Sequence, residues 1–161
     1  MAKKAKISNH LETFSPMIAI PFYWLDTNNV FLGVNEAFLT ITGLQEFSQI
    51  IGKNLLDIYP EKFAKQIINQ DKELLSTGQS YTQVEFIENA TTGIIEYIKS
   101  VRSPLYDEDG AIVGVMVLAV DITEEKELEQ FHHENILRLE AENKTQKILL
   151  EQQKKFKNIA A

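Results

Sequence analysis

The spacing of apolar residues along this chain changes several times, and each change marks the end of a predicted element. Two short apolar and β-prone runs come first, at residues 19–26 and 30–34. Thr27, Asn28 and Asn29 lie between them, and Asn tolerates the positive φ that tight hairpins require. The pattern predicts a two-stranded hairpin.

Several helices are predicted after this hairpin. Asn35 can cap a helix over residues 36–42, which Gly43 would end. Apolar residues at helical spacing predict a longer helix over residues 61–77, and Gly78 would end it. Two short helical turns are predicted between these helices, at residues 46–51 and 54–59.

Three further strands are predicted, at residues 81–88, 94–105 and 111–120, with turns at Gly93 and at Asp109-Gly110. The last of them is continuously apolar, which predicts a central strand covered on both faces. The order of elements indicates an α+β fold, with a five-stranded antiparallel sheet and helices on one face.

The remainder of the chain predicts one long helix that begins at the last strand. Residues 121–158 contain neither Pro nor Gly, and Asp121 or Thr123 can cap the helix. About 36 residues at ~1.5 Å each would extend roughly 54 Å, so we expect this helix to project from the domain. A weak coiled-coil seam lies along it, formed by Ile136, Leu139, Asn143 and Leu150.

These elements divide the chain into three parts. Residues 1–18 are a flank with a short helix, residues 19–121 form the domain, and residues 122–161 form the long helix. A chain of 161 residues with 44% hydrophobic residues can build such a core.

Charge and composition exclude several functions. A net charge of −7 argues against binding nucleic acid or an anionic membrane. The chain contains no cysteine, which removes disulfides, thiolate metal sites and cysteine nucleophiles. No apolar run reaches the roughly 18 residues of a membrane span. We therefore expect a cytoplasmic protein without direct membrane contact.

With these elements placed, residues 9–123 resemble the PAS sensor-domain family, in the style of bacterial sensor histidine kinases. The order and spacing of several short segments carry the resemblance: Phe22-Tyr23-Trp24-Leu25-Asp26, Val34-Asn35-Glu36-Ala37-Phe38, Ile51-Gly52-Lys53-Asn54, Ser103-Pro104-Leu105-Tyr106-Asp107-Glu108-Asp109-Gly110, Ile112-Val113-Gly114 and Asp121-Ile122-Thr123-Glu124.

The resemblance implies a sensory and regulatory role. Asp121, Ile122 and Thr123 match the signature that links the last strand to a signalling helix. The implied protein is a homodimer, joined through its N-terminal flank and C-terminal helix, that drives an effector such as a histidine kinase or a cyclic-nucleotide enzyme. A stand-alone adaptor whose helix docks another protein is the alternative, and an enzyme or photoreceptor is a third hypothesis.

Haem is not expected as a cofactor. In the PAS family, haem is usually held by a histidine on the long helix within the domain, which corresponds here to the predicted helix over residues 61–77. That helix contains no histidine. His10, His132 and His133 all lie outside the predicted core. His132 and His133 also lack the proline that follows a phosphoacceptor histidine, so we interpret them as solvated helix residues.

A cysteinyl-flavin adduct is excluded, while flavin bound without an adduct stays open. Light-sensing relatives use a cysteine after the Gly-x-Asn turn, and Leu55 follows Asn54 here. They also use a glutamine near the end of the last strand, where this chain has Ala119.

An unassigned small ligand is the broader option, and eight residues are predicted to point between helices and sheet. Simple filling of the core is the plainer interpretation. The eight candidates are Phe38, Leu55, Phe63, Ile67, Phe86, Tyr97, Val117 and Ala119. No buried charge is expected to mark a pocket, and Arg102 is expected to face outward.

No catalytic or metal site is predicted. Asp107, Glu108 and Asp109 share one turn without the ligand spacing of a calcium loop. Glu85, Glu88 and Glu96 lie on adjoining strands, but no nucleophile or phosphate loop accompanies them, so no reaction can be assigned.

Overall fold

The computed structural model describes residues 10–88 and 95–159. The predicted turn at Gly93 and the first nine residues of the predicted flank lie outside these ranges. The chain forms two compact units, Met1–Asp121 and Ile122–Ala161.

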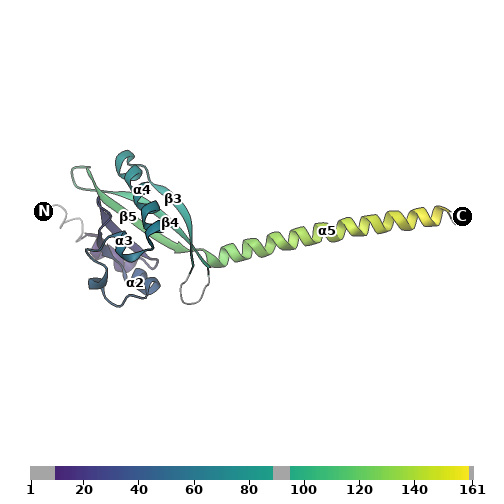
Figure 1. Ribbon diagram of the computed structural model, residues 1–161, viewed down its shortest axis with the longest axis horizontal. Helices are drawn as coiled ribbons and strands as arrows, with labels where there is room; N and C mark the ends of the chain where they lie inside the picture. Colours follow the sequence, from purple (N-terminus) through teal and green to yellow (C-terminus); the bar gives the residue numbers. More distant parts are fainter. Residues whose placement is uncertain (1–9, 89–94, 160–161) are drawn as a thin grey trace. The chain divides into compact units, whose positions relative to one another are not determined.

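The first unit contains a five-stranded antiparallel sheet with the helices of residues 36–77 on one face, which confirms the predicted fold class (Figure 1). Its strand order is β2-β1-β5-β4-β3, and β5 lies at the centre as predicted. The strands are β1 (Phe22–Asp26), β2 (Phe31–Val34), β3 (Tyr81–Glu88), β4 (Ile95–Tyr106) and β5 (Ile112–Asp121).

The helices begin and end at the residues that the sequence marks. Asn35 Oδ1 accepts a hydrogen bond from Phe38 N at 3.0 Å at the start of α2. Gly43 and Gly78 adopt left-handed φ angles of 69° and 71° after α2 and α4. The helical elements are η1 (Ser15–Met17), α2 (Glu36–Thr42), η2 (Phe47–Gln49), α3 (Leu55–Ile58) and α4 (Glu61–Thr77), and residues 10–14 are also helical.

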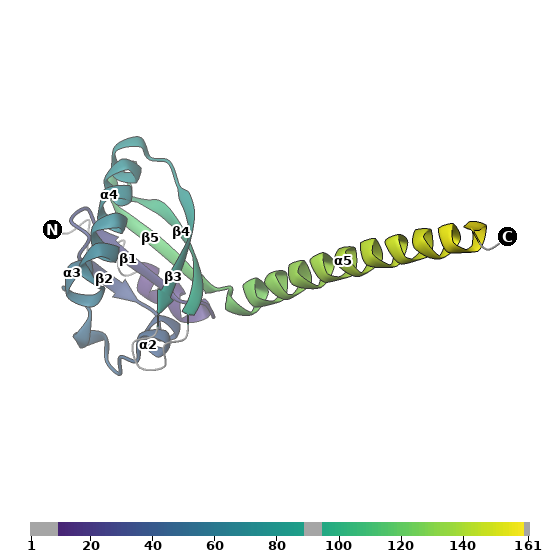
Figure 2. The same ribbon diagram turned by 45° about the vertical axis from the view of Figure 1, so that its right-hand side comes forward.

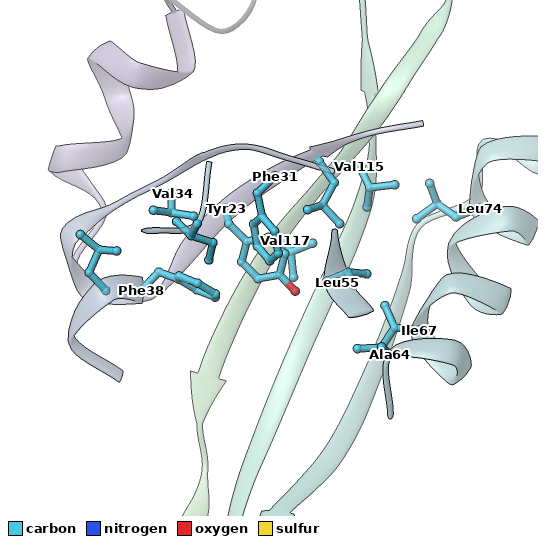
Figure 3. Close-up of a cluster of buried hydrophobic side chains, with 13 residues drawn as sticks. Tyr23, Phe31, Val34, Phe38, Leu55, Ala64, Ile67, Leu74, Val115 and Val117 are labelled. Carbon is cyan, nitrogen blue, oxygen red and sulfur yellow. The ribbon is translucent and has the colours of Figure 1, made fainter. Parts of the chain in front are cut away.

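Helix α4 lies across one face of the sheet, which we call the inner face (Figures 1 and 2). Figure 3 shows Val115 and Val117 of β5 in the same cluster as Ile67 and Leu74 of α4. Each of these four side chains is at most 2% exposed. Burying apolar surface of this kind is the main free energy that holds the layers together.

The outer face of the sheet has a smaller cluster of its own. Trp24 of β1 is 1% exposed there, and Leu11 and Ile18 from the chain before the sheet pack against its cluster. The Trp24 ring lies directly over Gly33 of β2, where a Cβ atom would come within 1.9 Å of the ring. Gly33 is therefore required by this packing.

The second unit contains α5 (Thr123–Ile159), a helix of 37 residues. Its predicted seam residues Ile136, Leu139 and Leu150 are 53–56% exposed. Pairing of two such helices remains a prediction. Among the described helices, none has both the length and the apolar character that crossing a membrane requires.

Candidate functional site

A cavity of about 840 Å³ opens within the first unit on the inner face of the sheet. Tyr23 of β1, Phe38 of α2, Phe63 of α4 and Ala119 of β5 contribute to its wall. The segment between α2 and α4 also contributes, so several elements enclose one space. A volume of this size lies in the range of small-molecule sites.

Aromatic rings form part of the wall. The ring centroids of Tyr23 and Phe38 are 4.8 Å apart, and those of Tyr59 and Phe63 are 5.3 Å apart. Burial raises the pKa of the Tyr23 and Tyr59 phenols. Both hydroxyls therefore stay neutral at physiological pH and can donate a hydrogen bond.

A buried carboxylate lines the same cavity. Glu85 of β3 is only 9% exposed, and Ser100 Oγ of β4 donates a hydrogen bond to Glu85 Oε1 at 3.3 Å. Burial raises the pKa of Glu85, while the nearby Arg102 and the Ser100 hydrogen bond oppose that shift. A carboxylate in such a place costs free energy unless a partner compensates for its lost hydration.

A second buried acid lies behind the cavity and is fully paired. Asp71 of α4 and Arg102 of β4 are each 0% exposed. Arg102 Nε donates to Asp71 Oδ1 at 2.7 Å, and Arg102 Nη2 donates to Asp71 Oδ2. The two acceptor oxygens match the planar guanidinium, which makes this a bidentate pair.

Three further polar groups complete the pair. Arg102 Nη1 donates to the Tyr23 hydroxyl at 3.0 Å. Asn29 Nδ2 donates to Asp71 Oδ2 at 2.7 Å, and the Tyr81 hydroxyl donates to Asp71 Oδ1 at 3.1 Å. The network joins α4 to β1, β3, β4 and the β1–β2 turn. Because Tyr23 also lines the cavity, this network reaches the cavity wall.

The eight predicted pocket residues divide into three groups. Phe38, Phe63, Ile67 and Ala119 line the cavity. Leu55 and Val117 are 0% exposed and belong to the packed core. The remaining two, on β3 and β4, lie on the other face of the sheet.

The expectation that Phe86 and Tyr97 point between helices and sheet is wrong. Phe86 is 72% exposed, and Tyr97 is its direct partner in the register of β3 and β4. Directly opposed residues share a face, whereas Glu85, next to Phe86, points inward. Because the edge strand β3 buries the acid Glu85, its apolar side chain Phe86 faces outward. This is the reverse of the prediction that apolar residues face the core.

The expectation of an outward Arg102, and of no buried charge near the pocket, is also wrong. A sequence signal for the pair existed on α4. Ala64, Ile67, Asp71 and Leu74 are the buried residues of that helix, so Asp71 lies on its apolar stripe. An ionised acid in such a position is costly unless a buried cation or other hydrogen-bond donors pair with it.

Other sequence candidates lie where solvent or local structure accounts for them. His132 and His133 are exposed on α5. Asp107 Oδ1 accepts hydrogen bonds from Asp109 N at 3.0 Å and from Ala111 N at 2.9 Å, which builds the turn between β4 and β5. No group of three potential metal ligands occurs among the residues that the structure describes.

The site is thus an aromatic cavity with a buried acid, inside a sheet-and-helix domain of the sensor type. The sequence model of the family described as the PAS fold matches residues 17–127. The chain belongs to the PAS family. No curated protein sequence matches it.

Solved structures share the fold at low identity. VqmA of Vibrio cholerae, from a study of its dimer in the absence of target DNA, is 21% identical with a TM-score of 0.63. That match covers 73% of this chain and 52% of VqmA, so this chain spans about half the length of that relative. A further structure is described as VqmA bound to DPO, with 21% identity, a TM-score of 0.61, and coverage of 70% of this chain and 56% of that one.

The PAS domain of Bordetella pertussis BvgS is 18% identical with a TM-score of 0.66. In this case the match covers 78% of this chain and 93% of the BvgS domain. At these identities the likeness shows the fold alone.

Proposed function

We propose that this chain is the sensory input module of a bacterial signal-transduction protein, in which a small ligand in the cavity changes the state of α5. One observation carries the proposal. Asp121, the last residue of β5, lines the cavity, and α5 begins at Thr123. One residue, Ile122, separates a cavity wall from the helix.

Strand β5 suits a relay because it is the central strand of the sheet. Ala119 and Asp121 both line the cavity, and Val115 and Val117 hold the same strand in the core. A packed core transmits a displacement and does not absorb it, since its atoms have little free space. A ligand that shifts the end of β5 would therefore bias the start of α5.

The exposed apolar residues of α5 support a homodimer in which two such helices pair. The effector would be a histidine kinase or a comparable output domain. Any catalytic activity would reside in that effector. The acidic composition argues against nucleic-acid binding by this module, and the lack of cysteine supports a cytoplasmic location.

A mutant cycle tests the relay without any knowledge of the natural ligand. Ala119→Phe would fill part of the cavity. The double substitution Asp121→Ala and Thr123→Ala, which we call the junction variant, would weaken the connection between β5 and α5. In the protein of natural length, we expect A119F to change effector output, measured as autophosphorylation if the effector is a kinase. With the junction variant present, that change should disappear.

The matched control removes an aspartate and a threonine elsewhere, through Asp109→Ala and Thr82→Ala, both exposed. This control should leave the A119F effect intact. An A119F effect of equal size with and without the junction residues would reject the relay. Thermal melts of each variant show whether the domain remains folded.

A further inference from the structure

The charge and shape of the cavity define a ligand class more narrowly than the family does. We propose that the cavity binds a small organic cation, a protonated amine attached to an apolar group, with Glu85 as its counter-ion. This inference rests on the proposed ligand-binding role and adds the chemistry of the ligand.

The ionisable residues of the cavity wall favour a cation. Four acids line it, Asp57, Glu85, Glu96 and Asp121, and the described lining residues include one cation, Lys53. Unlike charges within a few ångströms attract, and that attraction strengthens where water is excluded. A cationic ligand would enter a wall dominated by carboxylates, whereas an anion would meet repulsion.

Arg102 is not available to bind an anion. Its Nε and Nη2 donate to Asp71, and its Nη1 donates to the Tyr23 hydroxyl. The residue is 0% exposed and does not line the cavity. A ligand carboxylate or phosphate would have to break this bidentate pair to reach the guanidinium.

Glu85 has the free acceptor that an ammonium group requires. Ser100 supplies a hydrogen bond of 3.3 Å to Oε1, and Oε2 accepts no hydrogen bond from the described residues. The residue is nine-tenths buried and lines the cavity. An ammonium carries three donors, so it can pair with Oε2 and compensate for the lost hydration of the carboxylate.

The aromatic wall fits the rest of such a ligand. The rings of Tyr23, Phe38, Tyr59 and Phe63 can cover an apolar body, and their faces attract a cation within about 6 Å of the ring centroid. The same combination of aromatic faces and carboxylates discriminates against a free inorganic cation, which would lose its water without gaining enough oxygen ligands.

Matched compounds test this inference on the full chain by isothermal titration calorimetry. Each of three skeletons, phenylethyl, indolylethyl and butyl, is offered as an amine, an alcohol and a carboxylate. We expect at least one amine to bind about tenfold or more tighter than its alcohol, a difference of about 1.4 kcal/mol. The corresponding carboxylate should bind more weakly than the alcohol.

Glu85→Gln should reduce the preference for the amine over the alcohol by about tenfold or more, mainly by weakening the binding of the amine. Glu61→Gln removes the same charge from an exposed residue outside the cavity and should change nothing. Circular dichroism melts show that each variant is folded. If E85Q fails to fold, the ranking of amine, alcohol and carboxylate with the unsubstituted chain still decides.

The proposal of a cationic ligand would be wrong if, in every skeleton that binds, the alcohol or the carboxylate binds as tightly as the amine. That result would not contradict the proposed relay. No binding by any of the nine compounds would overturn the cationic ligand as well. Failure of the proposed function shows separately, in the mutant cycle at Ala119 and the junction, which uses none of these compounds.

Discussion

Asp71 and Glu85 are two buried acids on the inner side of one sheet, and they differ in what surrounds them. Asp71 receives hydrogen bonds from Arg102, Asn29 and Tyr81. Glu85 receives one from Ser100 and faces the cavity. A buried acid with a full set of hydrogen-bond partners stabilises the packing of its elements, whereas a partly paired acid beside a cavity can bind a ligand.

The largest expected effect on the free energy of unfolding comes from removing Asp71, the acid that is fully paired. Asp71→Ala would leave the Arg102 guanidinium buried without its partner, so we expect the free energy of unfolding to fall by about 3 to 5 kcal/mol. Chemical denaturation measures it. Glu61→Ala removes an acid from the exposed pair with Lys65 and should cost at most about 1 kcal/mol. Similar losses in the two variants would refute a structural role specific to Asp71.

The next effect concerns the residue that belongs to both regions. Tyr23→Phe removes the hydroxyl that accepts from Arg102 Nη1 and leaves that donor unsatisfied. We expect a loss of about 1 to 3 kcal/mol in the free energy of unfolding. Tyr106→Phe is the matched control, because Tyr106 is 49% exposed at the end of β4, and it should cost less. A smaller loss for Y23F than for Y106F would show that the hydroxyl of Tyr23 is not part of the network.

The effect at Glu85 should have the opposite sign and depend on pH. Burial raises the pKa of Glu85 above its ordinary value of 4.5, so the folded state binds a proton that the unfolded state releases as the pH rises. The unsubstituted chain therefore loses stability as pH rises from about 4.5 through the raised pKa.

Glu85→Gln cannot lose a proton, so we expect it to melt a few degrees higher than the unsubstituted chain at pH 7. The advantage should shrink to nothing near pH 4, where Glu85 is protonated in both states. Melting curves across this pH range measure it. An E85Q advantage that is constant with pH would contradict burial of an ionisable carboxyl.

The smallest effect tests the corrected facing of β3. Phe86 is 72% exposed, so Phe86→Ser should change the free energy of unfolding by no more than about 0.5 kcal/mol. Leu74→Ala, in the packed core beside Asp71, should cost about 2 to 5 kcal/mol. A large loss in F86S would place Phe86 back in the core and Glu85 in solvent.

Local signals predicted most of the fold, because they act over a few residues. The helices Glu36–Thr42 and Glu61–Thr77 and the strand Tyr81–Glu88 are confirmed residue by residue. Asn35 caps α2 by accepting a hydrogen bond from Phe38 N, and a left-handed glycine ends each of the two helices. These capping signals lie within a few residues of the helices that they define.

The polar part of the site could not be predicted in the same way, because it depends on pairs that are far apart in the chain. Arg102 and Asp71 are 31 residues apart, and Tyr23 is 79 residues from Arg102. Alternation along β3 predicts two faces but does not say which is inside. The inward face is decided by where Arg102 and Ser100 lie on the neighbouring strand, which the sequence of β3 does not contain.

The central claim is that filling the cavity changes the pairing of α5, and a distance between two copies tests it most directly. The chain has no cysteine, so Ala141→Cys, at an outer position of the predicted heptad, takes a single spin label. Pulsed electron paramagnetic resonance gives the distance between the two labels. It is measured on the labelled chain, on the same chain with Ala119→Phe, and on the chain with both Ala119→Phe and the junction variant. We predict one short distance that shifts with A119F and is restored to its original value by the junction variant. The absence of any defined distance, or an identical distribution in all three proteins, would contradict the account.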